Sequence, residues 1–81
     1  MPRLPRDLSG KELIKKLSKS WGYEKTHQTG SHVVLETKEP STHQIVVPEH
    51  KNLRIGTLNS ILRMVSAHKD VSREDILDTL K

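Results

Sequence analysis

Cysteine and phenylalanine are absent from this 81-residue chain, which also has only one tryptophan and one tyrosine. Without cysteine the protein has no disulfide framework, no catalytic thiolate and no cysteine-ligated metal site. Long apolar runs are also absent. No run approaches the roughly 18 residues of a membrane span, and residues 1–6 do not resemble a signal peptide. We therefore expect a cytoplasmic protein with no membrane partner.

The scarcity of aromatic residues predicts an almost purely aliphatic core. Ten leucines, five isoleucines and six valines make up about a quarter of the chain, which exceeds the roughly 20% below which disorder is expected. Trp21 and Tyr23 are the only aromatic side chains that can join this core. A chain of this length buries one thin core, so a deep substrate cavity and a doubly wound sheet are excluded.

The charge balance is moderately basic. Lysine and arginine total 14 against 10 acidic residues, which gives a net charge of +4. This balance favours an anionic partner, either a nucleic acid or an acidic protein. Plain solubility explains the same excess, so charge alone does not decide between the two interpretations.

Hydrophobic periodicity predicts the order helix, three strands, helix and a short last helix. The expected first helix covers 10–20, the strands cover 23–28, 31–37 and 43–47, the second helix opens at 56–57, and the last opens at 72. Short connections make the strands an antiparallel meander, and the two long helices pack on one of its faces. The predicted fold is α+β, with an irregular N-terminal arm over 1–8 and a single domain over 9–81.

Local signals at the helix ends support these boundaries. Ser9 and Glu12 form a capping box, and Gly22 is placed to end the first helix. In the second helix Thr57 is predicted to be the N-cap, and an apolar stripe over 58–65 faces the core. The capping box and the stripe are therefore assigned structural roles.

One histidine is placed where it is accessible for chemistry. In the strand 31–37, Val33 and Leu35 fall on one face and His32 on the other, because successive side chains alternate. If the helices cover Val33 and Leu35, His32 projects onto the open face beside a turn at Thr29-Gly30. A shift of one residue in the register would bury His32 instead.

Five short segments form a pattern that none of them specifies alone. They are Ser9–Leu13, Gly30-Ser31-His32, Val47-Pro48-Glu49-His50, Gly56-Thr57-Leu58 with Ile61-Leu62-Arg63, and Ser72–Asp75. In this order and spacing they resemble the HicA toxins of bacterial and archaeal toxin–antitoxin pairs. The resemblance covers about Leu8 to Leu80. It departs from many relatives at residues 33–35, which are more apolar here.

The resemblance implies both a fold and a function. HicA proteins have a double-stranded-RNA-binding-domain-like fold, which agrees with the predicted order of elements. They act as mRNA interferases, endoribonucleases that arrest growth, and a HicB-type antitoxin holds them inactive. The catalytic residue of the family is the histidine of its Gly-Ser-His motif, which falls on His32 here. The implied partners are therefore mRNA and a HicB-type antitoxin.

An imidazole suits this chemistry because RNA carries its own nucleophile, the 2′-hydroxyl. A neutral histidine with a pKa near 6.5 can take the hydroxyl proton at pH 7, and neither a metal nor another cofactor is required. Negative charge on the phosphate needs donors in place. The candidates are the backbone amides of Gly30 and Ser31, the side chains of Lys25, Lys51 and Arg54, and the helix N-terminus at Thr57.

The residues leave several alternatives open. The acid that protonates the leaving group could be His50, Tyr23, a lysine or water. A non-catalytic RNA-binding module of the same fold is the main alternative function, and a protein-interaction role without catalysis is another. A metal site is not favoured by the five histidines, because none forms a His-x-x-x-His pair. A serine–histidine hydrolase is disfavoured because Ser31 and His32 point to opposite faces of a strand.

Overall fold

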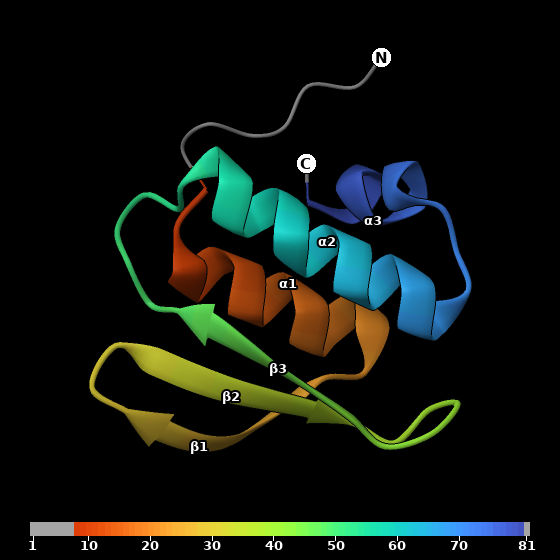
Figure 1. The fold of residues 1–81 in the computed structure, drawn as a ribbon, viewed down its shortest axis with the longest axis horizontal. Helices are drawn as coiled ribbons and strands as arrows, with labels where there is room; N and C mark the ends of the chain where they lie inside the picture. The colour runs from red at the N-terminus through yellow and green to blue at the C-terminus, as the bar shows by residue number, and fades with distance from the viewer. Residues whose placement is uncertain (1–7, 81) are drawn as a thin grey trace.

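Two helices lie across one face of a three-stranded antiparallel sheet in the computed structural model, which describes residues 8–80 (Figure 1). The elements are α1 (Gly10–Trp21), β1 (Glu24–Thr29), β2 (His32–Thr37), β3 (His43–Pro48), α2 (Ile55–Lys69) and α3 (Arg73–Thr79). The strands follow the order β1-β2-β3, as a meander requires. The α+β, double-stranded-RNA-binding-domain-like fold expected from the sequence is confirmed.

The helix α1 forms where its end signals predict it. The Ser9 hydroxyl accepts a hydrogen bond from the Glu12 amide at 3.1 Å, and Gly22 ends the helix in the left-handed conformation with φ +70°. Most of the expected arm over 1–8 lies outside the described residues. Leu8 is described, and its side chain is buried in the core with 5% exposure.

The core between the layers is aliphatic, as the composition predicts. It includes Leu13 and Leu17 from α1 and the apolar stripe of α2, packed on the inner face of the sheet. Tyr23 is completely buried, and Trp21 is partly buried and donates its indole N–H to the Thr79 hydroxyl at 2.9 Å. This hydrogen bond ties the end of α1 to α3.

The predicted start of α2 is wrong. The helix begins at Ile55, and its N-cap is Arg54 in an extended conformation, so Thr57 lies inside the first turn. Leu53 explains the earlier start, because its side chain is buried and its amide donates to the Leu8 carbonyl at 3.0 Å. This anchor fixes the chain directly before the first turn, where the Leu58 amide bonds to the Arg54 carbonyl at 2.9 Å.

The register of the sheet decides which side chains remain accessible. Val33 and Leu35 are completely buried under the helices, so the alternate residues of β2 face away from them. Pairing between β1 and β2 is regular from Thr29 back to His27, and a β-bulge interrupts it between His27 and Lys25. Within residues 8–80 we find no helix with the length and apolar character needed to cross a membrane.

Candidate functional site

Four segments that are distant in the sequence meet at one end of the sheet, which we call the site end. They are the turn Gly30-Ser31, the loop 49–54 and the first residues of α1 and α2, all on the left in Figure 1. The Gly10 amide donates to the His50 carbonyl at 2.9 Å, and the Glu49 amide donates to the Ser31 carbonyl. Main-chain hydrogen bonds therefore hold this end together.

His32 lies at the site end on the open face of the sheet. It is the first residue of β2, opposite Thr29 of β1 and Pro48 of β3, and its side chain is exposed. The burial of Val33 and Leu35 confirms the predicted register. Among residues 8–80 the His32 imidazole has no hydrogen-bond partner, so both of its ring nitrogens are available to a ligand.

The turn before His32 presents backbone rather than side chains. Gly30 and Ser31 form a two-residue connection between β1 and β2, and Gly30 has φ +58°. A positive φ at the first position of such a turn favours glycine. A Cβ atom at Gly30 would meet nothing within 4 Å, so the space beside this backbone is open. A phosphate group can therefore approach the turn closely.

Positive charge gathers on the neighbouring loop. Lys51 and Arg54 are exposed, and neither makes an ion pair within the described part of the chain. The first turn of α2, Ile55–Thr57, adds backbone amides that have no partner inside the helix, together with the positive end of the helix dipole. Of the predicted phosphate contacts, Lys51, Arg54 and Thr57 therefore come together at the site end with Gly30 and Ser31.

Lys25 does not join this group. It pairs with Leu35, three residues along β2 from His32, which corresponds to about 10 Å along the strand. The β-bulge changes the alternation of β1, so that Lys25 shares a register position with a residue of the inner face. Simple alternation from His27 would have placed Lys25 on the same face as His32.

Two of the residues considered as the leaving-group acid, Tyr23 and His50, lie in different parts of the structure. Tyr23 is completely buried, its hydroxyl lies 3.1 Å from Nδ1 of His43, and burial raises its pKa. It therefore lies away from the site end. His50 is exposed at the site end, with Nε2 at 3.4 Å from the Ser31 hydroxyl.

A second histidine on the open face was missed as a catalytic candidate. His27 pairs with Val34, so it shares a face with His32, and its Nε2 lies 2.9 Å from the Thr29 hydroxyl. His27 is one of the five histidines that the sequence offers, and these were considered together only for a metal site. Strand alternation counted back through a two-residue turn is the signal that would have found it.

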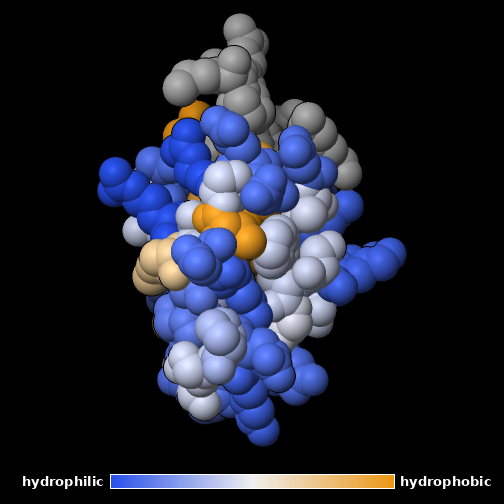
Figure 2. Space-filling view, turned by 90° about the vertical axis from the view of Figure 1, so that its right-hand side faces the viewer, coloured by the Kyte–Doolittle hydropathy of each residue, from blue (hydrophilic) through white to orange (hydrophobic). Residues whose placement is uncertain are grey.

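The opposite end of the sheet, which we call the far end, holds a network of buried and half-buried polar groups. His43 stacks on His68 with ring centroids 4.2 Å apart, and the Lys69 ammonium bonds to the Thr37 hydroxyl at 2.8 Å. Burial lowers the pKa of His43, and His68 and Lys69 lower it further. Figure 2 shows this end of the molecule as mostly hydrophilic, with small hydrophobic areas between the polar side chains. The network has a structural role.

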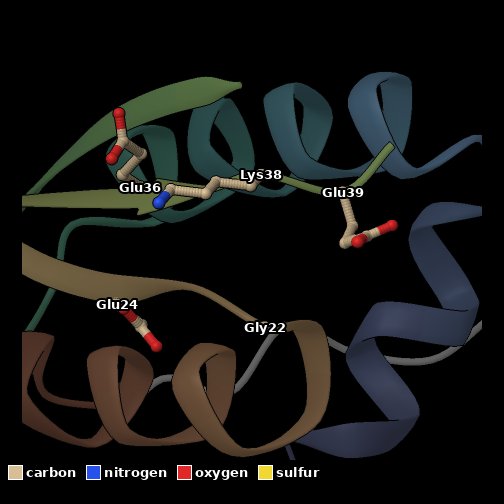
Figure 3. A pocket seen from close by; sticks show the side chains of 5 residues that line it. All are labelled: Gly22, Glu24, Glu36, Lys38 and Glu39. Atoms are coloured by element: carbon tan, nitrogen blue, oxygen red, sulfur yellow. The ribbon is translucent and has the colours of Figure 1, made fainter. Parts of the chain in front are cut away.

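A cavity of about 220 Å³ also lies outside the site end. It is lined by Gly22, Glu24, Glu36, Lys38 and Glu39. Figure 3 shows Lys38 extending toward Glu36 while Glu39 points away from both, so the charged groups do not converge on one point. In the described range no group of three or more potential metal ligands comes together.

Comparison with known proteins places the chain beside a family of toxins. A sequence model described as the HicA toxin of bacterial toxin–antitoxin pairs matches residues 10–66, which include the turn, His32, the loop and most of α2. No curated protein and no solved structure matches the chain. The matched segment covers more than half of the chain and contains the whole site end from Gly10 onward. The chain therefore belongs to the HicA toxin family, and this membership implies a toxin role and an antitoxin partner.

Proposed function

We propose that this toxin is a metal-independent endoribonuclease that cleaves mRNA, with His32 as the general acid–base, and that a HicB-type antitoxin neutralises it. The observation that carries the proposal is the free, exposed imidazole of His32 on the open face of the sheet. It lies beside a turn with open space and a loop with unpaired cations. This combination matches what cleavage of RNA by its own 2′-hydroxyl requires.

The reaction begins with removal of a proton from the 2′-hydroxyl by the neutral His32 imidazole. The 2′-oxygen forms a bond to the adjacent phosphorus, and the bond from phosphorus to the 5′-oxygen breaks. The departing 5′-oxygen takes up a proton from an acid or from water, so the products are a 2′,3′-cyclic phosphate and a free 5′-hydroxyl. General base catalysis of this kind contributes about 10²–10⁴-fold to the rate.

Donors near His32 stabilise the charge that develops on the phosphate oxygens. The amides of Gly30 and Ser31 flank the histidine in the chain, and Lys51 and Arg54 supply positive charge from the loop. The first turn of α2 adds a further anion-binding group. Lys51 and Arg54 are long, exposed side chains, which suits them to neutralising backbone phosphates rather than reading bases.

The antitoxin in this proposal acts by occlusion. The open face around His32 carries two apolar side chains, the partly buried Val34 and the exposed Val46, which lie opposite each other on β2 and β3. A partner that covers this pair also covers His32. A complex in which His32 stayed accessible to solvent would contradict occlusion as the mechanism of neutralisation.

Cleavage of a defined single-stranded RNA by purified protein in EDTA tests the proposed function. The wild type is expected to cut the RNA and leave 2′,3′-cyclic phosphate ends, and His32→Ala is expected to lose at least about 100-fold in rate. Thermal melts of both proteins confirm that each is folded. If neither cuts while both are folded, the function is not nucleolytic. Salt-dependent RNA binding without cleavage would then identify a binding module.

A further inference from the structure

We propose that His27 is a second catalytic residue of this site, which donates a proton to the 5′-oxygen that leaves when RNA is cleaved beside His32. The inference rests on the proposed endoribonuclease function. A ribose alkoxide is a poor leaving group, so cleavage gains from an acid as well as a base. The acid must lie on the same side of the sheet as His32 and within reach of the same phosphate.

The register of β1 and β2 places His27 in that position. Thr29 lies directly opposite His32, and His27 lies directly opposite Val34. Paired residues share a face, so His27 and His32 are diagonal neighbours on the open face. Diagonal neighbours in an antiparallel pair are about 7–8 Å apart, within reach of long side chains. A phosphate group can be contacted by both imidazoles across this gap.

Thr29 orients the His27 ring toward the site. Its hydroxyl lies 2.9 Å from Nε2 of His27, and Thr29 is also the residue opposite His32. The hydroxyl can donate or accept, so it can bind either the protonated or the neutral imidazole. The other ring nitrogen, Nδ1, has no partner among residues 8–80 and is available to substrate.

None of the remaining histidines is a neighbour of His32 on the open face of the sheet. His43 lies opposite Thr37, whose side chain is buried on the inner face, and its ring stacks on His68 at the far end. The ring of His50 contacts the hydroxyl of Ser31, the residue directly before His32. His50 belongs to the loop after β3 and not to a strand, and it is the alternative acid that the test below distinguishes from His27.

Two imidazoles complete the proton balance. Neutral His32 takes the 2′-hydroxyl proton as the bond from the 2′-oxygen to phosphorus forms. Protonated His27 gives its proton to the 5′-oxygen as the bond from phosphorus to that oxygen breaks. Exchange of one proton with water then restores both side chains. Glu24 and Glu36 also lie on this side of the sheet, at opposite register positions beyond the bulge, and Lys38 extends toward Glu36.

A substrate with an activated leaving group distinguishes the role of the catalytic acid from the role of the catalytic base. Uridine 3′-(4-nitrophenyl phosphate) releases nitrophenolate, which leaves without a proton, whereas the dinucleotide UpA releases a ribose hydroxyl. For His27→Gln we expect cleavage of UpA to fall at least about 100-fold and release of nitrophenolate to stay within about threefold of wild type. His32→Gln is expected to lose both activities. His68→Gln, at the far end, is the matched control and is expected to keep both.

Each other outcome overturns the inference in a distinguishable way. If His27→Gln cleaves UpA like wild type, His27 is not the acid. Loss of both activities, with an unchanged thermal melt, would indicate that His27 positions substrate instead. If His50→Gln shows the selective loss, the acid lies on the loop. Wild-type protein that cleaves neither these substrates nor the defined single-stranded RNA refutes the proposed function itself, and the inference with it.

Discussion

The sheet has a histidine at the start of two neighbouring strands, and the two have opposite surroundings. His32 opens β2 at the site end, exposed and without a partner among residues 8–80. His43 opens β3 at the far end, where its ring bonds to the Tyr23 hydroxyl at 3.1 Å and stacks on His68. The face of the sheet decides the difference, because His32 points away from the helices and His43 toward them. A histidine is therefore available for chemistry at the start of β2, whereas the histidine at the start of β3 has a structural role.

The two ends are also held together by different kinds of bond. At the site end the backbone of Gly10 bonds to the backbone of His50. At the far end side chains make the contacts, with Lys69 bound to Thr37 and His68 bound to a carbonyl of the loop after β2. A main-chain scaffold leaves side chains free, which is what a site for a polyanionic substrate needs.

The largest change in stability is expected from Gly10→Ala. A Cβ atom at Gly10 would lie 1.9 Å from the Pro48 carbonyl oxygen, and backbone atoms cannot move aside cheaply. We expect a loss of about 3 kcal/mol in the free energy of unfolding, because overpacking against backbone forces α1 away from the loop. For a domain of this size each kcal/mol lowers the melting temperature by about 4–8 °C, which calorimetry measures.

Gly56→Ala is the matched control for this prediction. Gly56 is exposed in the first turn of α2, and a Cβ atom there would meet nothing within 4 Å. Alanine favours the helix over glycine, so a gain of about 0.5–1 kcal/mol is expected. Equal effects of the two substitutions would show that α1 is not pressed against the loop at the site end.

Lys69→Met tests the far end with a smaller expected effect. The substitution keeps the apolar stem but removes the ammonium that bonds to the Thr37 hydroxyl at 2.8 Å and the Glu39 carbonyl at 2.7 Å. We expect urea denaturation to show a loss of about 1–2 kcal/mol, because these bonds involve a charged donor. Lys38→Met, at an exposed residue without such bonds, should change stability by less than about 0.5 kcal/mol. RNA cleavage at a temperature where Lys69→Met is folded should be unchanged, and a loss of cleavage would refute the separation of the two ends.

The lowered pKa of His43 predicts a pH dependence of stability. Burial is the main cause, so the folded protein keeps His43 neutral at a pH where the unfolded chain has already bound a proton. The unfolded chain then binds more protons. The stability that neutral His43 contributes is therefore present above about pH 6.5, the ordinary pKa of histidine. It is lost as the pH falls through the lower pKa that His43 has in the folded state. His43→Gln should flatten the stability profile between about pH 5 and 7, which urea denaturation at a series of pH values measures.

The smallest change is expected from Ser31→Ala. The Ser31 hydroxyl lies 3.4 Å from Nε2 of His50, which is long for a hydrogen bond, so stability should change by less than about 0.5 kcal/mol. Alanine keeps the backbone amide that the proposed mechanism uses, so the cleavage rate should stay within about threefold of wild type. A loss of 100-fold would assign a chemical role to the hydroxyl.

Local signals in the sequence predicted most of the fold. The Ser9 cap, the Gly22 stop and the alternation around His32 each depend on neighbours in the chain, and the structure bears them out. The predicted cap at Thr57 failed because a tertiary anchor at Leu53 starts α2 earlier. Local periodicity does not record such an anchor.

Parts of the site could not be predicted for a related reason. The β-bulge that turns Lys25 away from His32 leaves no mark in the alternation of polar residues, since every residue of β1 is exposed. The pairing of Tyr23 with His43 and the stacking of His43 on His68 join residues at least 20 positions apart. The arrangement of the strands brings Tyr23 to His43, and the packing of α2 on the sheet brings His68 to His43.

Side-by-side measurement of His32→Gln and His43→Gln tests the central claim most directly. Both variants replace one imidazole on the same sheet with the same amide, and each is assayed for RNA cleavage in EDTA and for thermal stability. We predict that His32→Gln loses at least about 100-fold in cleavage with an unchanged melting temperature. We predict that His43→Gln keeps cleavage within about threefold and melts roughly 4–8 °C lower, as expected for a loss of about 1 kcal/mol. Loss of cleavage by folded His43→Gln, with full activity in His32→Gln, would contradict the account.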